Sequence, residues 1–142
     1  MTRVSHFGKM GDLMYALPVL RALHRTTGQK VQLMTSGACW QLAPLLWEQP
    51  YIGDVELDDS QAHAIQENIF PGWEFFKAGE GLNLSLQPSY FEPTAPVSWT
   101  RCYMQAAGIS ELTDSDCVAL PSLVNHRRWM YGVDVSDRKS VV

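Results

Sequence analysis

The feature that most constrains the fold is a glycine-rich junction between a short apolar strand and a long apolar helix, HFGKMGDLMYALPVLRAL at residues 6–23. Residues 3–7 predict a strand that ends at Gly8, and residues 12–26 carry apolar side chains at the spacing of a largely buried helix. Gly28 follows a basic last turn and is expected to end this helix. A strand that leads through a tight turn into a buried helix is the first half of a βαβ unit.

The rest of the chain continues this alternation of strands and helices. Further strands are expected at 31–35, 54–57 and 82–87, and further helices at 38–49, 60–70 and 97–108. Alternation with short connections predicts an α/β fold, a Rossmann-like parallel sheet with helices on both faces and a strand order near 3-2-1-4. This domain is expected over residues 1–120, with a linker and the start of a missing second domain over 121–142.

Composition and charge exclude several classes of partner. The chain has 142 residues and a formal net charge of −4, without the clustered Lys and Arg that bind nucleic acid. It contains neither an apolar run of membrane-spanning length nor a secretory signal, so a cytoplasmic protein with at most peripheral membrane contact is expected. Cys39, Cys102 and Cys117 are too widely spaced for a zinc site and fit reduced thiols. No metal is expected.

The junction at residues 8–12 is compatible with more than one function. A helix amino terminus presents free backbone N–H groups and the positive end of the helix dipole, which favours anions such as phosphate. A dinucleotide site is disfavoured because the second expected strand ends in Thr35, Ser36 and Gly37 without an acidic residue. A Walker loop is excluded because its sequence is absent. Asp12 is therefore either a capping residue in the first helical turn or a catalytic carboxylate.

Several segments resemble one enzyme family. The segment GKMGDLMYALPVLRALHR is similar to the N-terminal signature of the ADP-heptose:lipopolysaccharide heptosyltransferases, glycosyltransferase family 9, in which a Gly-Asp pair precedes an apolar helix. The segments KVQLMTSGACWQLAPLL, QPYIGDVELDD, LNLSLQ and WTRCYMQAAGI resemble, in the same order, later strands and helices of that family. The resemblance extends over most of residues 3–109, and only the first segment is specific.

The resemblance implies the N-terminal half of a GT-B glycosyltransferase, which holds the acceptor sugar while a second domain holds most of the nucleotide-sugar donor. In such inverting enzymes an aspartate after the first glycine turn is the general base, and it corresponds to Asp12. A helix amino terminus is expected to keep this carboxylate ionised and weakly basic. The residues implied in binding acceptor or phosphate oxygens are Gly8, Lys9, Met10, Gly11 and Gln87. The donor, an ADP-sugar, is a substrate, so no cofactor is implied.

Two departures from the family pattern leave alternatives open. His6 stands where the family has branched aliphatic residues, and it is either a core histidine or a residue of the cleft. The fourth strand reads SLQPS, so Gln87 keeps only half of the family's motif. The chain is thus expected to be the acceptor half of a glycosyltransferase, acting on a glycan or glycolipid, or a non-catalytic Rossmann-like module that binds a glycan or partner protein. A donor-domain partner or a second copy is expected to cover apolar residues of 118–131.

Overall fold

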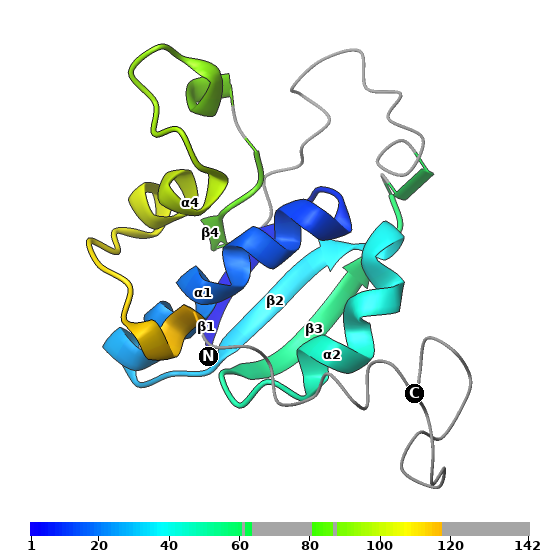
Figure 1. The fold of residues 1–142 in the computed structure, drawn as a ribbon. Coiled ribbons are helices and arrows are strands. Elements are labelled where there is room, and N and C mark those ends of the chain that lie inside the picture. Colours follow the sequence, from blue (N-terminus) through cyan, green and yellow to red (C-terminus); the bar gives the residue numbers. More distant parts are fainter. Residues whose placement is uncertain (61, 64–80, 87, 118–142) are drawn as a thin grey trace, which may run out of the picture.

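The computed structural model describes residues 1–60, 62–63, 81–86 and 88–117 (Figure 1). The strands are β1 (Thr2–His6), β2 (Val31–Ser36), β3 (Ile52–Asp58) and β4 (Leu82–Asn83). The α-helices are α1 (Met10–Thr27), α2 (Ala43–Trp47) and α4 (Trp99–Ala107), and short 3₁₀ helices span Gly37–Leu42, Pro88–Phe91 and Asp114–Cys117. The region 121–142, expected to begin a second domain, lies outside the described residues. Within the part described, no helix is long and apolar enough to cross a membrane.

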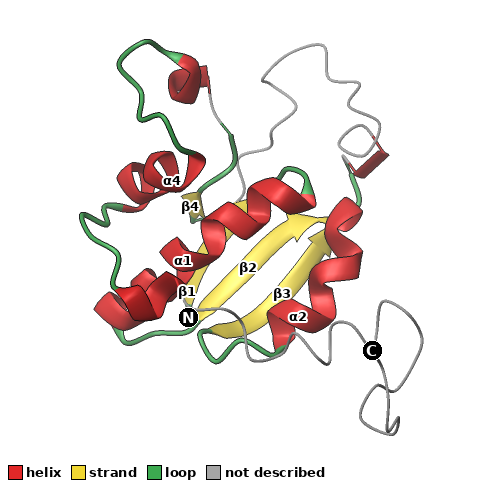
Figure 2. Ribbon diagram, viewed as in Figure 1, coloured by secondary structure: helices red, strands yellow, loops and turns green. Residues whose placement is uncertain are grey.

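The four strands form one parallel sheet in the order β3-β2-β1-β4, which confirms the predicted α/β, Rossmann-like sheet and its strand order (Figure 2). Strand β1 pairs with β2 along its whole length, from Thr2 opposite Val31 to His6 opposite Thr35. Because all strands run in the same direction, their carboxyl ends meet at one edge of the sheet. The β1–α1 junction lies at this edge.

Strand β4 is shorter than the strand predicted over 82–87. It pairs with β1 at two residues, and the Leu84 amide adds a further hydrogen bond to the Ser5 carbonyl oxygen at 2.8 Å. The backbone N–H of Ser85 then donates to the side-chain oxygen of Asn83 at 3.0 Å. This local turn gives the backbone a partner outside the sheet, so regular pairing ends there.

The first and last predicted helices form close to their expected bounds. Helix α1 begins at Met10, two residues earlier than predicted, and ends at Gly28 in the left-handed conformation with φ of 71°. Helix α4 begins after Ser98, whose hydroxyl accepts a hydrogen bond from the Arg101 amide at 3.2 Å, and ends at Gly108 with φ of 70°. At the carboxyl ends of both helices, glycine adopts the left-handed conformation that ends a helix without steric cost.

The helix predicted over 38–49 is divided in two. A 3₁₀ helix over Gly37–Leu42 precedes α2, and Pro44 lies in the first turn of α2. Proline has no backbone N–H to donate to the preceding turn, and its ring tolerates only the first turn of an α-helix. The chain therefore starts a new helix at Ala43. The helix predicted over 60–70 falls mostly on residues outside the described ranges.

The described α-helices lie over one face of the sheet (Figure 2). Strand residues on this face are fully buried: Val4, His6, Leu33 and Thr35. The opposite face carries polar and half-buried side chains around Arg3. The connection from β3 to β4, which contains the helix predicted over 60–70, falls largely outside the described residues. The apolar core thus lies between the sheet and the helices, directly beneath the β1–α1 junction.

Candidate functional site

Asp12 lies at the carboxyl end of β1, in the first turn of α1. Lys9 caps the amino terminus of this helix with its backbone alone, since its side chain makes no capping hydrogen bond. The Lys9 backbone N–H acts on the Asp12 carboxyl group and lowers its pKa. Asp12 is the third residue of the helix, a position from which an acidic side chain stabilises the amino-terminal turn.

The electrostatic surroundings of Asp12 differ from the sequence-based expectation. The carboxyl group is half-buried, and this loss of hydration raises the pKa of Asp12 above its usual value. The Lys9 amide and the Lys9 charge lower the pKa, but by less than burial raises it. The carboxylate is consequently a stronger base than a helix amino terminus alone would make it.

The turn beneath Asp12 is tightly packed around Gly8. A β-carbon built on Gly8 would lie 3.2 Å from Cε1 of His6 and 3.5 Å from Oδ2 of Asp12. The Gly8 carbonyl oxygen accepts a hydrogen bond from the Cys39 thiol at 3.3 Å. Burial raises the pKa of Cys39 to about 11, so this thiol remains protonated near neutral pH. Gly8 thus lies between the Asp12 carboxylate and the His6 ring, and a side chain there would press on the His6 ring.

His6 is a core histidine, the first of the two roles considered from the sequence. Its ring is fully buried, and Nε2 lies 3.0 Å from the hydroxyl oxygen of Tyr103 on α4. The two rings meet edge to face, with centroids 5.3 Å apart. Burial lowers the pKa of His6 to about 4, so the imidazole is neutral near neutral pH. The His6 ring also packs beside Gly8, so it supports the turn that carries Asp12.

Tyr103 belongs to this site although the sequence did not single it out. It is fully buried, and burial together with the nearby negative charge of Asp12 raises the pKa of its phenol. A second hydrogen bond ties the turn to the chain beyond β4, from the Phe7 amide to the Ser85 hydroxyl at 2.8 Å. The amphipathic pattern of residues 97–108 shows that Tyr103 is buried, but its contact with His6 depends on how α4 packs on the sheet.

The other residues that the resemblance implies in binding differ in their exposure to solvent. Lys9, Met10 and Gly11 are exposed around the amino terminus of α1, whereas Gly8 is buried. The Lys9 amide and the Lys9 charge both act to lower the pKa of Asp12. Gln87 lies outside the described residues. The junction therefore presents a half-buried carboxylate beside exposed main chain and an exposed lysine.

Two pockets lie away from the junction, on either side of α4. A pocket of about 450 Å³ is lined by Ser98, Thr100, Arg101, Met104, Ser110, Glu111 and Leu112. Another of about 340 Å³ is formed by α4 and the segment around the 3₁₀ helix Pro88–Phe91. Asp12 lines neither of them. Among the described residues no group of three or more His, Cys, Asp or Glu side chains is placed to hold a metal ion.

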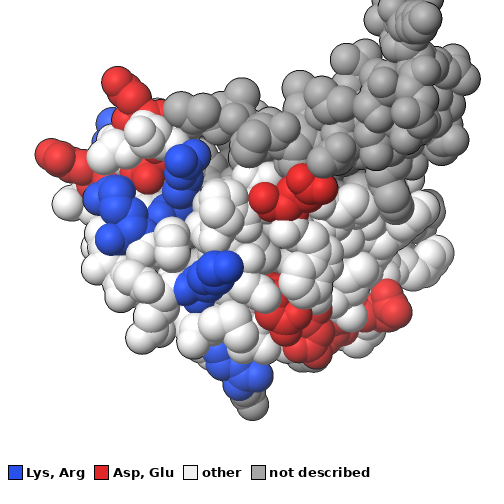
Figure 3. Space-filling view, turned by 90° about the horizontal axis from the view of Figure 1, so that it is seen from below, with Lys and Arg blue, Asp and Glu red and all other residues white. Residues whose placement is uncertain are grey.

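On the face drawn in Figure 3, basic and acidic side chains lie against one another at the upper left, and uncharged surface separates the other charged side chains. Comparisons with protein-family models, with curated proteins and with solved structures found no match for this chain.

Proposed function

We propose that the chain is the acceptor-side domain of an inverting, heptosyltransferase-like glycosyltransferase in which Asp12 is the general base. The observation that carries this proposal is the half-buried Asp12 carboxylate with a raised pKa at the carboxyl edge of a parallel sheet. Ligands of open α/β sheets bind at this edge. The similarity of GKMGDLMYALPVLRALHR to the heptosyltransferase signature supplies the reaction class.

In the proposed reaction, Asp12 accepts the proton of an acceptor hydroxyl as that oxygen attacks the anomeric carbon of an ADP-sugar. The bond from the anomeric carbon to the diphosphate oxygen breaks, the diphosphate leaves with the electron pair, and the anomeric configuration inverts. A carboxylate offers about four lone-pair positions, so Asp12 has acceptor positions for the hydroxyl of a sugar. The acceptor is a glycan or glycolipid, met in the cytoplasm or at the membrane surface, and a donor-binding domain supplies the ADP-sugar.

A non-catalytic role as a glycan-binding or protein-binding module is the second candidate. The observation that favours it is the place of Asp12 in the first turn of α1, because an acidic residue there stabilises its own helix and needs no substrate to explain it. The two candidates differ in what removal of the Asp12 charge does to sugar transfer.

The test uses a heptose-containing core oligosaccharide titrated into the ¹⁵N-labelled chain, followed by transfer assays with a donor-binding domain attached. We expect amide shifts at residues 8–12, and binding within a few-fold of wild type for Asp12→Asn. Transfer by Asp12→Asn should fall by about 10²–10⁴, the usual contribution of a positioned base. Asp114→Asn, which alters an exposed acid in a distant 3₁₀ helix, is the matched control.

Shifts confined to other parts of the chain would contradict an acceptor site at the junction. Binding at residues 8–12 with undiminished transfer by Asp12→Asn would instead contradict the role of Asp12 as base.

A further inference from the structure

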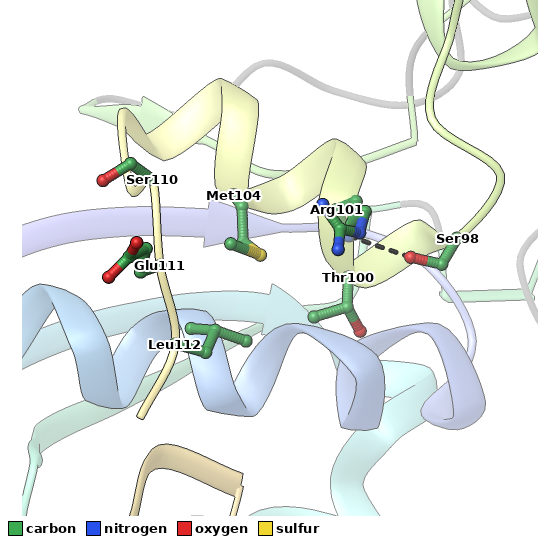
Figure 4. Close-up of a pocket in the computed structure, with 7 residues that line it drawn as sticks. All are labelled: Ser98, Thr100, Arg101, Met104, Ser110, Glu111 and Leu112. Atoms are coloured by element: carbon green, nitrogen blue, oxygen red, sulfur yellow. Dashed lines mark hydrogen bonds between the residues drawn. The ribbon is translucent and has the colours of Figure 1, made fainter. Parts of the chain in front are cut away.

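The pocket of about 450 Å³ beside α4 has charged ends and an apolar centre. Figure 4 shows Arg101 at the end formed by the start of α4, and Glu111 at the opposite end, in the segment that follows the helix. Met104 and Leu112 lie between them and make the centre apolar. A volume of this size lies within the range of small-molecule sites, which extends from roughly 300 to 1,000 Å³.

The two charges that line this pocket do not neutralise each other. No ion pair joins Arg101 to Glu111, and in the described part of the chain neither side chain has another charged partner. Arg101 also lies in the first turn of α4, where the helix dipole repels a cation and where α4 has no acidic residue. An anion placed at this end of the pocket would therefore relieve an unfavourable arrangement.

Two of the hydroxyl groups that line the pocket form hydrogen bonds within the protein. Ser98 accepts a hydrogen bond from the Arg101 amide at 3.2 Å, and Thr100 donates to the Tyr15 carbonyl oxygen at 2.9 Å. The Ser98 bond caps the start of α4, and the Thr100 bond holds that start against α1 beside Arg101. Ser110 and Glu111 are exposed at the other end, where they offer oxygen acceptors to a donor group.

We propose that this pocket binds a small zwitterionic molecule of about monosaccharide size, with a phosphate or carboxylate at Arg101 and an ammonium group at Glu111. A ligand with charges at both ends pairs with both side chains at once, while its uncharged middle covers Met104 and Leu112. The site is separate from Asp12 and does not depend on the function proposed for that residue.

The experiment compares four probes that differ only in their charged groups: glucosamine 6-phosphate, glucose 6-phosphate, glucosamine and glucose. Each is titrated into the ¹⁵N-labelled chain at low ionic strength. Glucosamine 6-phosphate should bind most tightly and shift the amides of Arg101, Met104 and Glu111. Each matched charge should improve affinity by roughly two- to fivefold, as expected for an ion pair near the surface.

Two substitutions assign each end of the ligand. Arg101→Gln should abolish the advantage of the phosphate while keeping that of the amine, and Glu111→Gln should do the reverse. Lys30→Gln, which removes an exposed charge beyond the far end of α1, should leave all four affinities unchanged. Equal affinities for the four probes would overturn the proposal. Shifts outside the pocket, or variants that bind every probe as wild type does, would also overturn it.

Discussion

Gly8 and Gly11 stand three residues apart at the same junction and have different physical roles. Gly8 is buried between the His6 ring and the Asp12 carboxylate, where a β-carbon would meet Cε1 of His6 at 3.2 Å. Gly11 is exposed in the first turn of α1, where a β-carbon would have nothing within 4 Å. Of the two, Gly8 is the one whose surroundings are tightly packed.

The two glycines therefore predict opposite effects of the same substitution. Gly8→Ala should lower the free energy of unfolding by about 1–3 kcal/mol, because the added carbon forces apart a packed junction. Gly11→Ala should raise it by about 0.5–1 kcal/mol, because alanine favours the helix and loses less backbone entropy than glycine. Urea denaturation of both variants beside wild type measures the difference. A Gly8→Ala variant as stable as Gly11→Ala would contradict the packing described here.

At the scale of elements, an ion pair joins the carboxyl-terminal end of α1 to the 3₁₀ helix Asp114–Cys117. Nη2 of Arg25 lies 2.9 Å from Oδ2 of Asp116, whose side chain is 1% exposed. Asp116 also accepts a hydrogen bond from the Thr113 amide at 2.9 Å and donates its own amide to the Thr113 hydroxyl at 3.2 Å. This reciprocal capping box presents a buried carboxylate to Arg25 in a fixed orientation.

Loss of this ion pair should destabilise the protein in a pH-dependent way. Burial by itself would raise the pKa of Asp116, but hydrogen bonds from Arg25 and Thr113 hold it below its usual value. A carboxyl group whose pKa is lower in the folded state adds stability at pH values above its unfolded-state pKa. That stability is lost as the pH falls through the folded-state pKa. Arg25→Gln should therefore lower the urea midpoint at pH 7, by an amount that shrinks as the pH drops below about 3.8.

The control for this prediction is Arg101→Gln, which removes an arginine without an ion-pair partner among the described residues. Its urea midpoint should be no lower than that of wild type, and its difference from wild type should be the same at both pH values, because the helix dipole that repels Arg101 does not titrate. A pH-independent loss of stability in Arg25→Gln would show that packing of the arginine stem matters more than its charge.

For the whole molecule, the His6–Tyr103 hydrogen bond joins the central strand of the sheet to α4 inside one core. His6 has a pKa of about 4 in the folded chain, against about 6.5 for an unperturbed histidine. The unfolded state therefore binds more protons than the folded state between these two values. The free energy of unfolding should fall as the pH decreases from 6.5 to 4, by roughly 3 kcal/mol.

Urea denaturation across this pH range measures the slope. His6→Gln, which keeps a polar group near Tyr103 but does not titrate, should flatten the slope, whereas the exposed control His63→Gln should retain it. Direct NMR titration of the His6 ring gives the pKa even if His6→Gln fails to fold. A ring that titrates near 6.5 would contradict its burial.

The sequence alone determined the features that depend on neighbouring residues. The alternation of apolar strands and helices predicted the parallel sheet and its order, because short connections and the usual crossover handedness leave few arrangements. Ser98, Gly28 and Gly108 marked helix ends correctly, since each acts through hydrogen bonds or backbone conformation within a few residues. The end of β4 after Asn83 also has a local cause. The Asn83 side chain accepts a hydrogen bond from the Ser85 N–H and so competes with pairing in the sheet.

Tertiary structure alone decided which distant groups meet and which charges lose water. His6 and Tyr103 are 97 positions apart, and Arg25 and Asp116 are 91 positions apart, so no local pattern pairs them. The sequence placed Asp12 at the amino terminus of a helix, where a weakly basic carboxylate was expected. Only the packing around the junction half-buries that carboxylate and raises its pKa. Hydration depends on every element that covers a group, and the sequence of one segment does not contain that information.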